Sequence, residues 1–181
     1  AAAVEAVAIG GNPIKSEGGA TLLETIRTSK LKTIDIGKPL PLQEPYESDT
    51  LDLSSTDMDP GHVLLLSWWL TTEFSAAIPR LSLSGNMITG SKSDKSTNYD
   101  WKYDPDLFGL DSLCEALQVL KNPIELDLSN CGLSVNGMKL VAKAISSSTV
   151  LARLILDENP LTGGRDSTDF DTDITGITDL C

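Results

Sequence analysis

The chain is poor in the residues from which most catalytic and metal sites are built. His62 is its only histidine, so a two-histidine zinc site is excluded, and we expect no nucleophile or orienting acid to serve it. The glycine-rich pieces at 10–11 and 163–164 lack the Lys-Ser/Thr continuation of a phosphate loop. These absences predict a protein that is not an enzyme and that uses neither a cofactor nor a metal.

Cysteine is also scarce, and its positions form no pairing pattern. Cys114, Cys131 and Cys181 make an odd number with no CxxC spacing. Such thiols are typical of a reducing compartment, where a buried cysteine acts as a small apolar residue. No segment resembles a signal peptide, and there is no Asn-x-Ser/Thr sequon. We therefore expect a cytoplasmic or other intracellular location.

Basic residues and long apolar runs are both in short supply. Lys and Arg number 14 against 26 Asp and Glu, which gives a formal net charge of −12. This charge disfavours nucleic acid and anionic membranes as partners, because their phosphates would repel it. The most apolar stretch, 63–70, is too short to span a membrane. Two interpretations of the acidity are open: a basic protein partner, or a surface that only maintains solubility.

What is present is one spacing, found six times. The copies begin near positions 4, 31, 48, 78, 123 and 151. The most regular two read Leu126-x-Leu128-x-x-Cys131-x-Leu133 and Leu151-x-x-Leu154-x-Leu156-x-x-Asn159-x-Leu161. The alternating apolar pair predicts a short strand that buries one face. The residue three positions later is Asn in three copies, and we expect its amide to lie inside and to bond backbone groups of the turn.

A helix pattern follows several of these strand patterns. Gly and two apolar residues recur at i, i+4 spacing, at Gly18, Leu22 and Ile26, at Gly109, Leu113 and Leu117, and at Gly137, Val141 and Ile145. With the 28-residue step from 123 to 151 and Cys131 in the Asn position, this pattern resembles the ribonuclease-inhibitor-like branch of the leucine-rich repeat family. The resemblance implies an α/β solenoid, or horseshoe, with a parallel β-sheet on the concave face and helices on the convex face.

Two steps depart from the regular length. The step from 31 to 48 leaves no room for a helix, and its prolines would interrupt one. The step from 78 to 123 carries an extra polar stretch at about 91–106, which predicts a surface loop. The sequence from 170 onward parallels the sequence from 103 onward but stops within the helix pattern. We therefore expect residues 1–181 to be a single solenoid segment cut from a longer array.

The resemblance places candidate binding residues on the concave face. Alternate residues of each strand would point outward there, and they are short, mildly acidic and without a Trp or Tyr anchor. The candidates are Asp35, Asp52, Arg80, Ser82, Glu125, Asp127, Arg153, Ile155 and Asp157. The aspartates among them would contact a basic partner.

A second candidate surface lies on the predicted convex face. Trp68 occupies a position that is charged in the other helix patterns, and Leu64 and Leu65 lie beside it in the sequence. Two alternatives are open: these residues form an exposed apolar contact, or the helix is rotated and buries the tryptophans.

The spacing Asp169-x-Asp171-x-Asp173 raises the question of calcium. An EF-hand loop would need Gly at its sixth position and Glu at its twelfth, where this chain has Ile174 and Leu180. We therefore favour helix capping by these acids over an irregular calcium site.

The sequence as a whole predicts a non-catalytic protein–protein interaction or scaffold module. One alternative is a sensor or regulatory segment of a multidomain protein, such as a nucleotide-binding receptor or a GTPase-activating protein. Another is a structural subunit of a large assembly. The repeat pattern itself does not choose among them, because unrelated recognition proteins share it.

Overall fold

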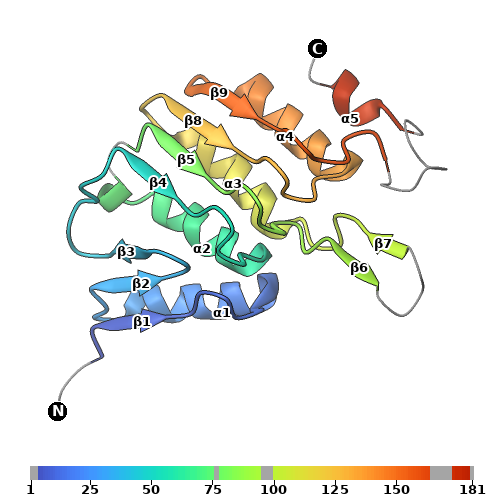
Figure 1. Ribbon diagram of the computed structural model, residues 1–181. Helices are drawn as coiled ribbons and strands as arrows, with labels where there is room; N and C mark the ends of the chain where they lie inside the picture. The colour runs from blue at the N-terminus through green and yellow to red at the C-terminus, as the bar shows by residue number, and fades with distance from the viewer. Residues whose placement is uncertain (1–3, 76–77, 95–99, 164–172, 180–181) are drawn as a thin grey trace.

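Strands and helices alternate along most of the chain in the computed structural model, which describes residues 4–75, 78–94, 100–163 and 173–179 (Figure 1). The fold is α/β. Its main sheet has four parallel strands in the order β4 (Thr50–Asp52), β5 (Arg80–Ser82), β8 (Ile124–Asp127) and β9 (Leu151–Ile155). The register pairs Leu51 with Leu81 and Leu81 with Leu126, so the buried residues align on one face.

A smaller sheet precedes the main one. β1 (Ala6–Ala8) and β2 (Thr33–Asp35) are parallel, and β3 (Pro39–Pro41) returns antiparallel to β2. The prediction that this short step contains no helix is confirmed, because a β2–β3 hairpin takes its place. Gly37 in the turn has φ of +123°, and a Cβ there would lie 2.6 Å from Cβ of Thr56. The turn therefore packs directly on the following copy.

The helices lie on one side of the strands and stack in chain order (Figure 1). They are α1 (Lys15–Thr28), α2 (Pro60–Leu70), α3 (Phe108–Val119) and α4 (Val135–Ser147), and the short α5 (Thr175–Thr178) contacts α4. Glycines allow the first three to approach closely, since a Cβ on Gly19 would lie 2.6 Å from the Gly61 carbonyl oxygen. A Cβ on Gly109 would likewise collide with the carbonyl oxygen of Pro60. Among the described residues, no helix is both long and apolar enough to cross a membrane.

One hydrophobic core runs beneath both sheets. Leu40 of the smaller sheet and Leu51 of the main sheet are completely buried in it. α2 lies between α1 and α3, and ten of its eleven residues are buried. A helix that is apolar on every side must be covered on every side, which explains the central place of α2.

The asparagine in two copies connects neighbouring turns. The Asn86 side-chain oxygen accepts hydrogen bonds from the N–H groups of Thr56 (3.0 Å) and Met58 (2.9 Å). Its nitrogen donates to the carbonyl oxygens of Leu53 (2.8 Å) and Leu83 (2.9 Å). Asn159 repeats the same pattern two copies later, with Cys131, Leu133, Leu128 and Leu156 as partners.

The expected buried position of this asparagine is confirmed at Asn86, which is 1% exposed. Asn159 is half-buried, while Asn12 in the first copy is exposed and its side chain donates to Ile9 and Gly10 of its own turn. The role of the amide therefore depends on whether a preceding turn lies against it.

The stretch predicted as a polar surface loop is more ordered at its base than expected. It contains an antiparallel hairpin of β6 (Lys92–Asp94) and β7 (Asp100–Lys102). The buried Ser91 hydroxyl donates to the Gly132 carbonyl oxygen (2.8 Å) and accepts from the N–H of Asp104 (2.9 Å). The Asp104 carboxylate accepts from the N–H of Gly137 (2.8 Å) at the start of α4. The insertion therefore supplies a cap for α4, the second helix that follows it in the chain.

Candidate binding surface

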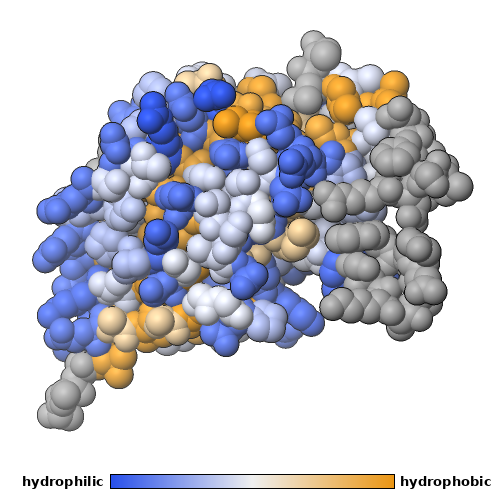
Figure 2. All heavy atoms as spheres, viewed as in Figure 1, coloured by the Kyte–Doolittle hydropathy of each residue, from blue (hydrophilic) through white to orange (hydrophobic). Residues whose placement is uncertain are grey.

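The strand face of the main sheet brings seven of the nine candidate residues together. The strand register places the outward-pointing residues of neighbouring strands side by side, in two rows that run across the sheet. The first row is Thr50, Arg80, Glu125 and Arg153, and the second is Asp52, Ser82, Asp127 and Ile155. Figure 2 views the molecule from this side, where polar side chains cover most of the strands and apolar atoms show between them. The remaining two candidates are separate: Asp35 belongs to the smaller sheet, and Asp157 follows β9.

A hollow of about 420 Å³ lies over the middle of this face. Ser82 is at its centre, with Asp52 on the strand at one side and Asp127 on the strand at the other. Two strands that flank a third are about 10 Å apart, so the hollow forms because the central side chain is small. The Ser82 hydroxyl donates to Oδ2 of Asp127 at 3.4 Å.

One ion pair borders the hollow. Nε of Arg80 lies 3.5 Å from Oε2 of Glu125, and both side chains are largely open to solvent. A pair this exposed contributes little to stability. Both groups are consequently free to exchange their partner for a charged group of a ligand.

The aspartates of this face also have a local structural role that the sequence reasoning missed. Oδ1 of Asp52 accepts from the N–H (2.9 Å) and the hydroxyl (2.5 Å) of Ser54, and Asp127 binds Ser129 in the same way. The sequence signal for these turns is the pattern Asp-x-Ser at the end of a strand. The Ser54 hydroxyl and N–H lower the pKa of Asp52, so its carboxylate is ionised at neutral pH.

The structure corrects the expectation for the helical face. Leu64 and Leu65 are buried, at 7% and 2% exposed, and are packing residues rather than contact residues. Trp69 is fully buried, donates its indole N–H to the Pro41 carbonyl oxygen (2.7 Å) and meets Tyr46 edge-on. Only Trp68 stays partly exposed. These residues are buried because α2 lies between α1 and α3. The spacing of the repeat in the sequence carries no information about these neighbours.

His62 has an acidic neighbour that the sequence reasoning did not assign to it. It is completely buried, and Nδ1 lies 2.9 Å from Oδ1 of Asp59 in a reciprocal cap at the start of α2. Nε2 lies 3.2 Å from the carbonyl oxygen of Ile9, an acceptor, so Nε2 carries a proton. The signal was Asp-Pro-x-His, an N-cap followed by proline. These contacts join α2 to the end of β1.

Acidic side chains at helix starts act as caps. Asp173 accepts from the N–H (2.9 Å) and hydroxyl of Thr175 at the start of α5, which agrees with the capping expected of this residue. Asp169 and Asp171 lie outside the described residues. Within the described residues, no group of three His, Cys, Asp or Glu side chains is arranged to hold a metal ion.

Two of the cysteines occupy buried positions. Cys114 and Cys131 are free thiols, and burial raises the pKa of each to about 12. Cys131 Sγ donates weakly to the Leu83 carbonyl oxygen at 3.2 Å. A buried thiol with so high a pKa is unreactive. The third, Cys181, lies outside the described residues.

Comparison of the sequence with known proteins does not assign the chain to a family. No protein-family model and no curated protein sequence matches the chain. The chemistry of the strand face is therefore the basis for a functional assignment.

Proposed function

We propose that this chain is a leucine-rich repeat solenoid of the ribonuclease-inhibitor-like type, and that its strand face binds a cationic protein without catalysing a reaction. Three features support the repeat assignment. Each sequence copy contains a strand at the same point, the helices stack on one side of the strands, and Asn86 and Asn159 make the same four hydrogen bonds. Stacked copies of this kind expose one broad sheet face, which such proteins use for recognition.

The observation that carries the binding proposal is the hollow over Ser82 with a carboxylate on each side. A lysine or arginine side chain entering it would meet Asp52 and Asp127 together, and Glu125 at the rim. Oδ1 of each aspartate is occupied by its serine turn, so these turns hold the carboxylates in place for the ligand. The net charge of −12 would in addition attract a basic protein from a distance.

The test uses a fluorescently labelled peptide of alternating lysine and serine, with an alternating glutamate and serine peptide as the negative probe. Fluorescence anisotropy measures binding to the wild type and to Asp127→Lys. We expect Asp127→Lys to weaken binding of the lysine peptide about tenfold, with a smaller dependence on salt. The matched control is Glu24→Lys, which makes the same charge change on the exposed side of α1. Equal losses in the two variants would show that net charge alone drives binding and would reject this site.

A further inference from the structure

The helical face carries a groove whose floor is the one exposed part of α2. Trp68 is the single residue of α2 that is not buried. The groove measures about 290 Å³, and α1 and α3 form its walls through Leu23 and Ala116. Removing water from an indole that lies between aliphatic walls is favourable, so a partner that covers this groove would bind through it.

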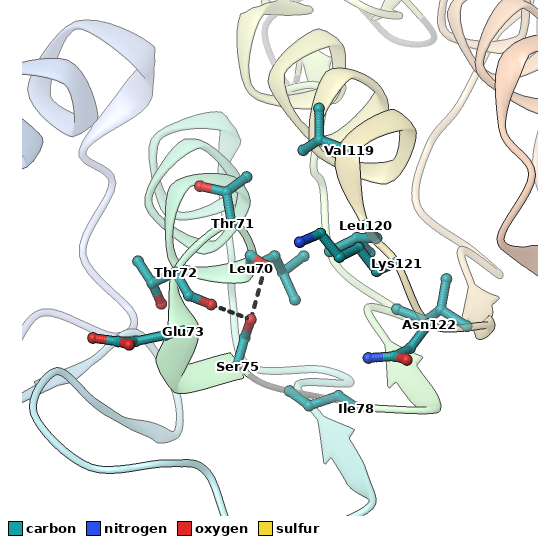
Figure 3. Close-up of a pocket in the computed structure, with 11 residues that line it drawn as sticks. Leu70, Thr71, Thr72, Glu73, Ser75, Ile78, Val119, Leu120, Lys121 and Asn122 are labelled. Atoms are coloured by element: carbon teal, nitrogen blue, oxygen red, sulfur yellow. Dashed lines mark hydrogen bonds between the residues drawn. The ribbon is translucent and has the colours of Figure 1, made fainter.

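An exposed valine stands at the end of this groove. Val119, on the last turn of α3, is 62% exposed. It also borders a second hollow of about 430 Å³ at the C-terminal ends of α2 and α3, which Figure 3 shows in close-up. Thr71 and Val119 line both hollows, so the two form one continuous depression with Val119 on its edge. Leu70 and Ile78 lie at the bottom of the second part and are buried.

The two walls of the groove carry opposite charges. The guanidinium of Arg27, on α1, lies 6.0 Å from the Trp68 ring centroid, and Glu115 lines the groove from α3. Among the described residues, neither side chain forms an ion pair within 4.0 Å. Rotating a second copy by 180° about an axis that runs along the groove above Trp68 places the positive wall of one copy over the negative wall of the other. A surface with this layout is complementary to itself.

We propose that a second copy of this chain covers the helical face in a two-fold symmetric dimer. Val119 of each copy enters the Trp68 groove of the other, and Arg27 of each copy pairs with Glu115 of the other. This surface lies on the opposite side of the molecule from the hollow over Ser82, so the dimer leaves both strand faces free. The inference is independent of the proposed recognition of a cationic protein.

The test is sedimentation equilibrium of the full chain over a range of concentrations, with circular dichroism to verify the fold of each variant. We expect the wild type to dimerise, and Val119→Glu to be monomeric because it places a charge in an apolar contact. Arg27→Glu and Glu115→Arg should each raise the dimer dissociation constant about tenfold or more. The double variant Arg27→Glu/Glu115→Arg keeps the wild-type net charge and should dimerise like the wild type, since the two charges are exchanged.

Three outcomes would overturn the dimer. A wild type that stays monomeric at every concentration would show that the groove does not bind a second copy of this chain. Association that is unchanged in Val119→Glu would place the contact between copies elsewhere on the surface. A double variant no better associated than the single variants would show that Arg27 and Glu115 do not face each other.

Discussion

The Asp106 carboxylate accepts two hydrogen bonds from Ser16, a residue 90 positions earlier in the chain. Oδ1 accepts from the Ser16 hydroxyl (2.5 Å) and Oδ2 from its backbone N–H (3.2 Å). α1 has no side-chain cap of its own, and the next N–H toward its N-terminus, that of Lys15, binds Asp59 at 2.6 Å. Carboxylates from two later copies thus neutralise the partial positive charge at the start of α1.

Removing the Asp106 charge should therefore destabilise the fold through α1. Asp106→Asn is expected to lower the free energy of unfolding by about 1–2 kcal/mol, the usual cost of losing a helix cap. Urea denaturation followed by circular dichroism measures the change. Asp157→Asn is the matched control, because Asp157 is exposed, and it should change stability by less than about 0.5 kcal/mol. Similar losses in both variants would contradict the capping role.

Replacing Asn86 should cost far more than replacing Asn12, although both occupy the same position of the repeat. Asn86→Ala leaves the N–H groups of Thr56 and Met58 and two carbonyl oxygens unpaired in the interior. We expect a loss of about 3 kcal/mol or more in the free energy of unfolding, because each buried unpaired group is costly. Asn12→Ala should cost under about 1 kcal/mol, since water can replace its exposed contacts. Equal losses from the two substitutions would be inconsistent with this view.

Asp59 should stabilise the fold at neutral pH but not in acid. Burial raises its pKa, but the hydrogen bonds from His62 and from the N–H of Lys15 outweigh that effect and bring the pKa below the ordinary 3.8. The folded state thus binds this proton less tightly than the unfolded state, so the stabilisation exists above about pH 4 and is lost below it. Asp59→Asn should be less stable than the wild type at pH 7, and the difference should shrink between about pH 4 and pH 2. A pH-independent difference in urea unfolding would refute this.

Asp104 should show the opposite pH dependence. Burial raises its pKa above 3.8, although N–H groups of Gly137 and Ser134 act against the shift. The folded state binds this proton more tightly than the unfolded state, so the associated stabilisation is present below about pH 4 and is lost as the pH rises through the folded pKa. Asp104→Asn is uncharged at every pH. Its stability relative to the wild type should therefore improve as the pH rises from about 3 toward 7. A relative stability that falls over this range would argue against a raised pKa.

The buried thiols should be unreactive in the folded protein. In a Cys181→Ser background, Cys114 and Cys131 are the remaining cysteines, and burial raises the pKa of both to about 12. A disulfide reagent such as Ellman's reagent at about pH 8 should not modify the native chain but should modify both thiols in denaturant. Rapid modification of the native chain would show that one of these copies opens locally.

Much of the strand arrangement could be predicted from local patterns. The alternation around Leu81 and Leu126 places these residues inside and Ser82 and Asp127 outside, because the side-chain period of a strand is two. The three prolines in the short step likewise predict the lack of a helix there. Such features depend only on the backbone preferences of a few adjacent residues.

Other features depend on residues that are distant in the sequence. Trp69 is buried and Trp68 is not, because α1 and α3 enclose α2 from two sides. Asp104 caps α4 from an insertion that reads as a plain polar loop. Neither contact has a periodic signature, since each joins a side chain to an element from another copy.

The sequence by itself determined the repeating strand, the inward apolar residues and the acidic character of the outward ones, because these follow from short-range geometry and composition. The tertiary structure alone decided which carboxylates cap which helices and where the hollow over Ser82 lies. It also decided that Trp68 is the part of α2 left open to solvent. These depend on the alignment of separate copies, where strand register and helix packing bring residues such as Ser16 and Asp106 within hydrogen-bonding distance.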